Sequence, residues 1–231
     1  MGGGAIDRGF LKPALPKTQT IPREPRWPAT LALVVIGALH YALPSVLTPG
    51  PDWLPLLLII VLSIPAILAH RRKMYRANET IGYVLLALVT VYLIVALALL
   101  IGRLPAHRES PKALLIAASG LWASNVLVFA SWYWRLDAGG PNQREIRGVH
   151  TGGAFLFPQM MLEGELRKNI AGPYWSPGFV DYLFLAFNTS TAFSPTDVPV
   201  LSRWAKLMMM VQSCISLSTL AILAARAINI L

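Results

Sequence analysis

The sequence predicts an all-α fold: a polytopic membrane helical bundle with five long transmembrane helices plus one short helix, either re-entrant or a sixth span. Hydrophobic residues make up 55% of the chain and charged residues only 13%, and a soluble domain carries about twice that charged fraction. The apolar residues also fall in runs of roughly twenty, the length that crosses a bilayer as a helix. The lipid bilayer is therefore the first expected partner.

The distribution of basic residues predicts the orientation of these helices. The net charge is +9, but the lysines and arginines lie between apolar runs, which the positive-inside rule explains without a nucleic-acid partner. Basic residues are frequent in the N-terminal tail and after the second helix (Arg8, Lys12, Lys17, Arg23, Arg26; Arg71, Arg72, Lys73, Arg76), whereas the first loop, Thr48–Asp52, has none. The N-terminus is accordingly expected in the cytoplasm.

The first part of the chain divides into a tail and four apolar runs. Residues 1–27 form a cytoplasmic polar tail rich in proline, and residues 28–135 form a four-helix transmembrane region. Its helices are expected at about 28–43, 53–69, 80–101 and 111–134, each bounded by proline, glycine or charged residues. Pro65 lies inside the second run and predicts a kink there.

The fourth helix carries the first candidates for contact between helices. Asn125 is an amide inside an apolar run, and such a side chain usually bonds to a neighbouring helix. Gly120 and Ser124 form a pair of small residues four apart, a pattern that favours close helix packing. The helix ends in an aromatic belt, Ser131–Arg135, whose cation is expected to snorkel to the interface.

Residues 136–176 form a polar, glycine-rich loop with one short apolar patch, Phe155–Met161. The patch is too short to span and either lies on the membrane interface or caps the bundle.

The last segment, residues 177–231, has the layout of a membrane pore hairpin: a short helix, a polar turn and a long transmembrane helix of about residues 202–230. Phe179–Thr191 is too short to span alone, so it either re-enters or continues through the turn as a sixth span. The six-span layout is slightly favoured and places both termini inside, with 195–201 as an external turn. Hydroxyl and carboxylate groups concentrate in the polar turn (Thr189, Thr191, Ser194, Thr196, Asp197).

The final helix carries a polar face at helical spacing, formed by Gln212, Ser216 and Thr219. A polar stripe on a membrane helix points inward, either to bond a neighbouring helix or to line an aqueous path.

The polar turn resembles a known motif. Residues 189–197, Thr-Ser-Thr-Ala-Phe-Ser-Pro-Thr-Asp, align without gaps with the potassium-channel filter Thr-Leu-Thr-Thr-Val-Gly-Tyr-Gly-Asp, matching at Thr189, Thr191 and Asp197. Ser194, Pro195 and Thr196 replace the glycine, tyrosine and glycine that let backbone carbonyls line a pore. The whole chain resembles uncharacterised bacterial integral membrane proteins, a domain-of-unknown-function family with a degenerate channel-like C-terminal hairpin. That resemblance implies a multi-pass protein of the bacterial inner membrane.

Two functions follow from these features. The hairpin favours a channel-like or transport protein, although no ion or solute is identified. The alternative is a non-catalytic structural or interaction subunit of a membrane complex, and a homo-oligomer stays open in either case. No catalytic or metal-binding motif is present, and Cys214 alone cannot form a disulfide within one chain, so neither an enzyme nor a cofactor is expected.

Overall fold

A computed structural model describes residues 24–44, 47–48, 50–103, 110–172, 175–191 and 197–228. The described chain is helical, with one isolated antiparallel bridge, Phe155 to Val200, in place of any strand. This confirms the all-α prediction. The helices are α1 (Trp27–Tyr41), α2 (Leu54–Arg71), α3 (Tyr75–Arg103), α4 (Pro111–Leu136), α5 (Gly140–Arg147), α6 (Gly164–Ile170), α7 (Phe179–Thr191) and α8 (Arg203–Ile228).

In the described chain, four helices are long and apolar enough to cross a membrane: α2, α3, the α4 segment and α8. The prediction of five long spans is wrong at α1, which has 15 residues and would extend about 22 Å at ~1.5 Å per residue. Its backbone leaves the helix at Ala42, two residues before Pro44, and it begins with Pro28 in its first turn. Pro28 and Pro44 bound this helix as the sequence predicts, but the helix between them has too few residues to cross the membrane.

The other boundaries differ by a few residues from the prediction. Helix α2 continues through Pro65 to Arg71, and α3 begins at Tyr75 rather than near residue 80. The basic segment between them is therefore a short turn at Arg72–Met74, with Arg71 and Arg76 inside the helices.

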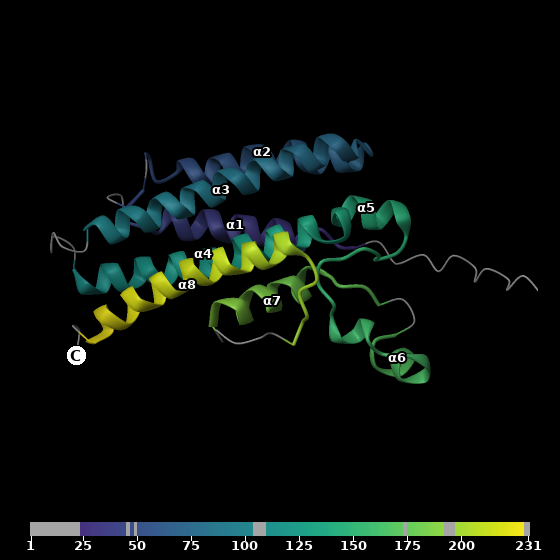
Figure 1. Ribbon diagram of the computed structural model, residues 1–231. Helices are drawn as coiled ribbons and strands as arrows, with labels where there is room; N and C mark the ends of the chain where they lie inside the picture. Colours follow the sequence, from purple (N-terminus) through teal and green to yellow (C-terminus); the bar gives the residue numbers. More distant parts are fainter. Residues whose placement is uncertain are drawn as a thin grey trace, which may run out of the picture.

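Helices α1 to α4 run alternately up and down, and α4 lies at the centre of the whole bundle (Figure 1). Helix α4 packs against α1 and α3 on one side and against α7 and α8 on the other. The beginnings of α1, α3, α7 and α8 lie at the same end of the bundle as α5, here called the α5 end (Figure 1). The opposite end holds the α1–α2 connection and the beginning of α4.

Helices α7 and α8 run in the same direction, as equivalent contacts along both show. Near their beginnings, Tyr182 and Trp204 both pack against Phe155. Eight residues further along each helix, Ser190 Oγ accepts a hydrogen bond from Gln212 Nε2. The chain must therefore return to the α5 end between α7 and α8 (Figure 1). In the six-span layout the two helices would be antiparallel, so the structure differs from it.

The predicted loop 136–176 contains the short helices α5 and α6, and its apolar patch caps the bundle. Phe155 and Phe157 are buried, and Phe155 packs on Tyr133 of α4 as well as on α7 and α8. The sequence left open whether this patch lies on the membrane interface or caps the bundle. Phe155 and Phe157 cap the bundle, while Met161 is exposed. The buried part of the patch fixes α7 and the beginning of α8 against α4.

Large apolar side chains remain exposed along the outer surface of the bundle. They include Val61 and Ile64 on α2, Val91 on α3 and Leu207 and Leu217 on α8. Outward-facing apolar side chains on helices of spanning length are typical of contact with lipid tails, which supports the predicted membrane location.

Candidate functional site

Gln212 of α8 connects three helices inside the bundle. Its Oε1 accepts a hydrogen bond from Tyr133 of α4 at 2.6 Å, and its Nε2 donates to Ala186 O and Ser190 Oγ of α7 at 2.7 and 2.8 Å. The Gln212 side chain is completely buried. One amide thus satisfies polar groups from both neighbouring helices, where an unpaired polar group would be costly.

The rest of the polar face also bonds inside the protein. Asn125 Nδ2 donates to Ser216 Oγ at 3.0 Å and to Gln212 O at 3.2 Å, which is the interhelical bond expected of this asparagine. Thr219 donates to carbonyl oxygens of its own helix, and both Ser216 and Thr219 are buried. The face formed by Gln212, Ser216 and Thr219 therefore lies against α4 and α7.

The filter-like residues do not form a common site in the described chain. The hydroxyls of Thr189 and Thr191 donate to the carbonyl oxygens of Leu185 and Phe187, four residues back in α7. Thr189 is buried and Thr191 is exposed, as is Asp197 after the turn. Ser194 and Thr196 lie outside the described residues.

The predicted small-residue pair on α4 is only partly buried. Ser124 is buried, but Gly120 is half-buried, and an added Cβ would have Leu43 Cδ2 as its nearest neighbour at 3.9 Å. The close helix contact occurs at Gly37 of α1 instead, where an added Cβ would lie 2.8 Å from Leu56 Cδ1 and 3.2 Å from Leu56 Cα of α2.

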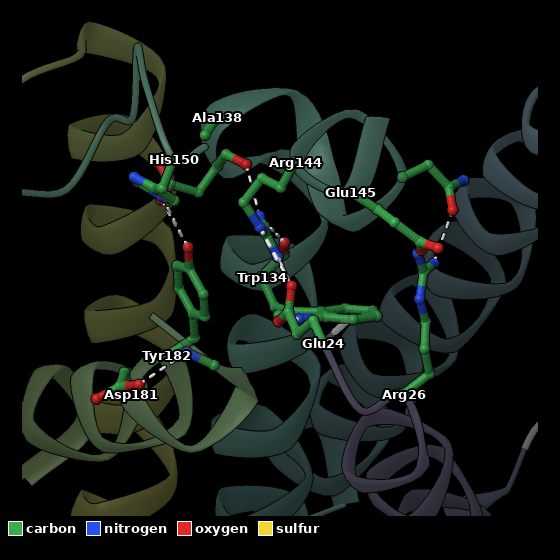
Figure 2. A network of polar contacts seen from close by, with 12 residues as sticks. Glu24, Arg26, Trp134, Ala138, Arg144, Glu145, His150, Asp181 and Tyr182 are labelled. Carbon is green, nitrogen blue, oxygen red and sulfur yellow. Dashed lines mark hydrogen bonds and ion pairs between the residues drawn. The ribbon is translucent and has the colours of Figure 1, made fainter. Parts of the chain in front are cut away.

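A second polar cluster lies at the α5 end and centres on the buried Asp137. Figure 2 labels two of its members, His150 and Tyr182. The Tyr182 hydroxyl donates to Asp137 Oδ2 at 2.7 Å, and His150 Nε2 lies 2.8 Å from the same oxygen. The other carboxylate oxygen accepts the backbone N–H of Ala154. Asp137 thus joins the end of α4 to α7 and to the segment that carries the bundle cap.

Two ion pairs attach the segment before α1 to α5. Glu24 pairs with Arg144 at 2.9 Å and accepts a bond from the Trp134 indole, while Arg26 pairs with Glu145 at 2.9 Å (Figure 2). Arg144 also donates to the backbone oxygens of Trp134 and Asp137, so hydrogen-bond acceptors surround its guanidinium group. These contacts fix α5 across the ends of α1 and α4.

Sequence reasoning missed the Asp137 cluster. Its members are separated by up to 45 residues, and His150 is one of four histidines that are scattered through the sequence. The available signal was the Asp-Ala-Gly-Gly-Pro segment at 137–141 directly after an apolar run. In the structure Gly139 and Gly140 adopt positive φ, and a side chain at Gly140 would collide with Arg135 O. This sharp turn places the Asp137 side chain within hydrogen-bonding distance of Tyr182, near the beginning of α7.

The geometry of the two clusters fits helix-to-helix connection. Asp137, Tyr182 and Gln212 are fully buried and hydrogen-bonded. No group of three or more metal-binding side chains occurs among the described residues.

The fold and the two clusters define a class. The described residues form an all-helical structure with four helices of membrane-spanning character, in which a short helix and a long one run in parallel and buried polar side chains connect the helices. Comparisons with protein-family models, curated proteins and solved structures find no match to the chain. The resemblances to potassium channels and to bacterial integral membrane proteins therefore stay predictions.

Proposed function

We propose that the chain is a non-catalytic structural or interaction subunit of a membrane complex, with the C-terminal hairpin as a closed, re-entrant structural unit. The observation that carries this proposal is the Gln212 connection. On the polar face of α8, Gln212 and Ser216 are bonded to neighbouring helices and Thr219 to its own helix, so none of the three is left to line a path through one chain.

The re-entrant arrangement follows from length and direction. Helix α7 has 13 residues, about 20 Å at ~1.5 Å per residue, whereas the hydrocarbon core is about 30 Å thick. Since α7 and α8 are parallel and both begin at the α5 end, the chain would enter the membrane there with α7 and return to the same side before α8. With the N-terminus in the cytoplasm, that end is cytoplasmic and carries the basic turn after α2. This orientation belongs to the proposal.

The interaction role is supported by the surface around α6. Met161, Leu166 and Ile170 are more than half exposed, and α6 projects from the bundle beyond the ends of the long helices (Figure 1). Apolar side chains concentrated outside the main core are typical of contact surfaces.

Cross-linking followed by purification from native membranes tests this role. We expect the tagged chain to retain a stoichiometric partner and the double variant Leu166→Ser/Ile170→Ser to lose it while keeping the parent's unfolding temperature. Ile146→Ser is the control, because Ile146 is equally exposed at the same end but lies on α5. Recovery of the chain alone, or equal loss in the control, would contradict the role.

A channel-like function between several copies is the second candidate, because a half-length helix parallel to a long one is also the layout of a pore module. Liposomes containing the purified chain would then conduct cations, and Asp197→Asn would change their charge selectivity, since Asp197 is exposed. Flux no greater than in empty liposomes would reject this candidate and leave the first.

A further inference from the structure

A pocket opens between α1, α2, α3 and α4 at the α5 end. Its empty volume is about 690 Å³, with the open mouth included, and its wall includes Arg26, Arg71 and Arg135 together with Ser63, Asn78 and Gly82. The part of this space that the centre of a water-sized sphere can reach is about 150 Å³, which is less than the roughly 300–1,000 Å³ of typical small-molecule sites. The pocket is separate from the Gln212 connection, which lies on the other side of α4.

The described part of the pocket wall carries positive charge without a carboxylate: three of its described residues are arginines, and none of them is Asp or Glu. Arg26 uses its two terminal nitrogens on Asn142 and Glu145, and burial lowers the pKa of its guanidinium. Arg135 has no ion pair among the described residues. Arg26 is already paired with Glu145, and the Glu79 carboxylate acts electrostatically on Arg135. The positive charge open to an anion therefore comes chiefly from Arg71 and Arg135.

Three hydrogen-bonding groups of the wall are buried and have no partner in the described chain: Arg26 Nε, Arg135 Nη1 and Ser63 Oγ. They come from the beginning of α1, the end of α4 and the middle of α2. Both arginine atoms can only donate, and the serine hydroxyl can donate as well. Buried donors without acceptors are costly, and a ligand that supplies several acceptor oxygens would satisfy them.

The Arg135 side chain is held inside the bundle rather than extended to the surface, where its position at the helix end would let it snorkel. Its guanidinium lies 5.9 Å from the Tyr83 ring and 5.7 Å from the Trp134 ring. It also packs directly on Gly82 of α3, where any side chain would overlap it. The absence of a side chain at position 82 creates the space for the cation.

We propose that this pocket binds a phosphoryl group, carried by an anionic lipid headgroup or by a free phosphate ion. Arginine binds phosphate oxygens through paired N–H donors, and basic pockets between transmembrane helices bind lipid headgroups. The wall also contains apolar residues, among them Leu33, Ile67 and Leu85, and Ile67 is 42% exposed on the outside of α2. An acyl chain would lie beside these residues while the headgroup contacts the arginines.

Native mass spectrometry of the purified chain tests the lipid source, with phosphatidylglycerol as the probe and phosphatidylcholine as the neutral comparison. We expect preferential retention of phosphatidylglycerol, weakened about tenfold in Arg135→Gln and in Gly82→Ala. Ser63→Ala should also weaken retention without lowering the unfolding temperature of the lipid-free protein, because Ser63 Oγ has no hydrogen-bond partner among the described residues. This variant keeps the test decisive if an arginine variant fails to fold.

Thermal unfolding with inorganic phosphate in a neutral detergent tests the free-ion source. A rise in unfolding temperature that Arg135→Gln abolishes would assign the site to a free anion, and phosphatidylglycerol retention alone would assign it to a lipid. The matched control is Arg76→Gln, since Arg76 is exposed on α3 at the same end and does not line the pocket. Absence of both effects, or equal weakening in Arg76→Gln, would overturn the proposal.

Discussion

Gln212 and Asp137 each accept or donate several hydrogen bonds where water is excluded, and they connect segments far apart in the chain. Gln212 joins α8 to α4 and α7, and Asp137 joins the end of α4 to Tyr182 and Ala154. Removing either side chain leaves its partners buried and unpaired, which costs more than the bonds themselves contribute.

Gln212→Leu should lower the free energy of unfolding by about 1–3 kcal/mol, because Tyr133, Ser190 and Ala186 would each lose a partner. Denaturant titration of the detergent-solubilised protein measures this change. Gln143→Leu is the control, since Gln143 is exposed on α5 and should alter stability by no more than about 0.5 kcal/mol. Equal stability of the two variants would refute the role of Gln212.

Asp137→Asn should destabilise the protein by a similar amount, about 1–3 kcal/mol, since an amide N–H₂ would replace an oxygen that accepts hydrogen bonds. The same titration detects the loss, and limited proteolysis should show earlier cleavage between α6 and α7. Asp197→Asn removes the same charge at an exposed position and is expected to leave both measurements unchanged. A silent Asp137→Asn would show that the cluster does not secure α7.

From the sequence alone, contacts of single residues could be predicted only where polar side chains occur at helical spacing inside an apolar run. Asn125 and the Gln212 face could be identified because polar residues in an apolar run must bond to something. The Asp137 cluster and the contact of Arg135 with Gly82 could not, because they depend on a tight turn and on how α3 lies against α4.

At the scale of helices, hydropathy identified the apolar segments but not their direction. A 13-residue helix followed by a polar turn fits a re-entrant helix and the first half of a span equally well. The direction of α7 depends on Phe155 and Gln212, whose contacts with α7 are formed by tertiary packing.

Among the described residues, Gly37 of α1 lies in a closer helix contact than Gly120 of the small-residue pair on α4. Gly37→Val should destabilise the α1–α2 contact by about 1–3 kcal/mol, because the added atoms would overlap Leu56. Gly120→Val introduces the same side chain where an added Cβ would have no atom nearer than 3.9 Å, so we expect the smaller loss. Unfolding temperatures of both variants in one detergent provide the comparison, and a larger loss for Gly120→Val would contradict the packing at Gly37.

At the scale of the whole molecule, the two ends of the bundle differ in charge. The α5 end holds the basic turn after α2, both ion pairs of the N-terminal segment and the arginine pocket. At the opposite end, the described residues include few full charges, such as Asp52, Arg103 and Lys112. In the orientation proposed above, which the positive-inside rule favours, the α5 end lies in the cytoplasm and the parallel α7 and α8 place the end of α8 outside.

Cysteine labelling of oriented membrane vesicles tests this account most directly. In a Cys214→Ser background, single variants Thr151→Cys, Asp197→Cys and Lys112→Cys place thiols at exposed positions before α7, after α7 and at the opposite end. A maleimide that cannot cross the membrane should label Thr151→Cys and Asp197→Cys from the same side, and Lys112→Cys from the other. Labelling of Asp197→Cys from the side of Lys112→Cys would show that the chain crosses the membrane between residues 151 and 197, and would contradict the re-entrant hairpin.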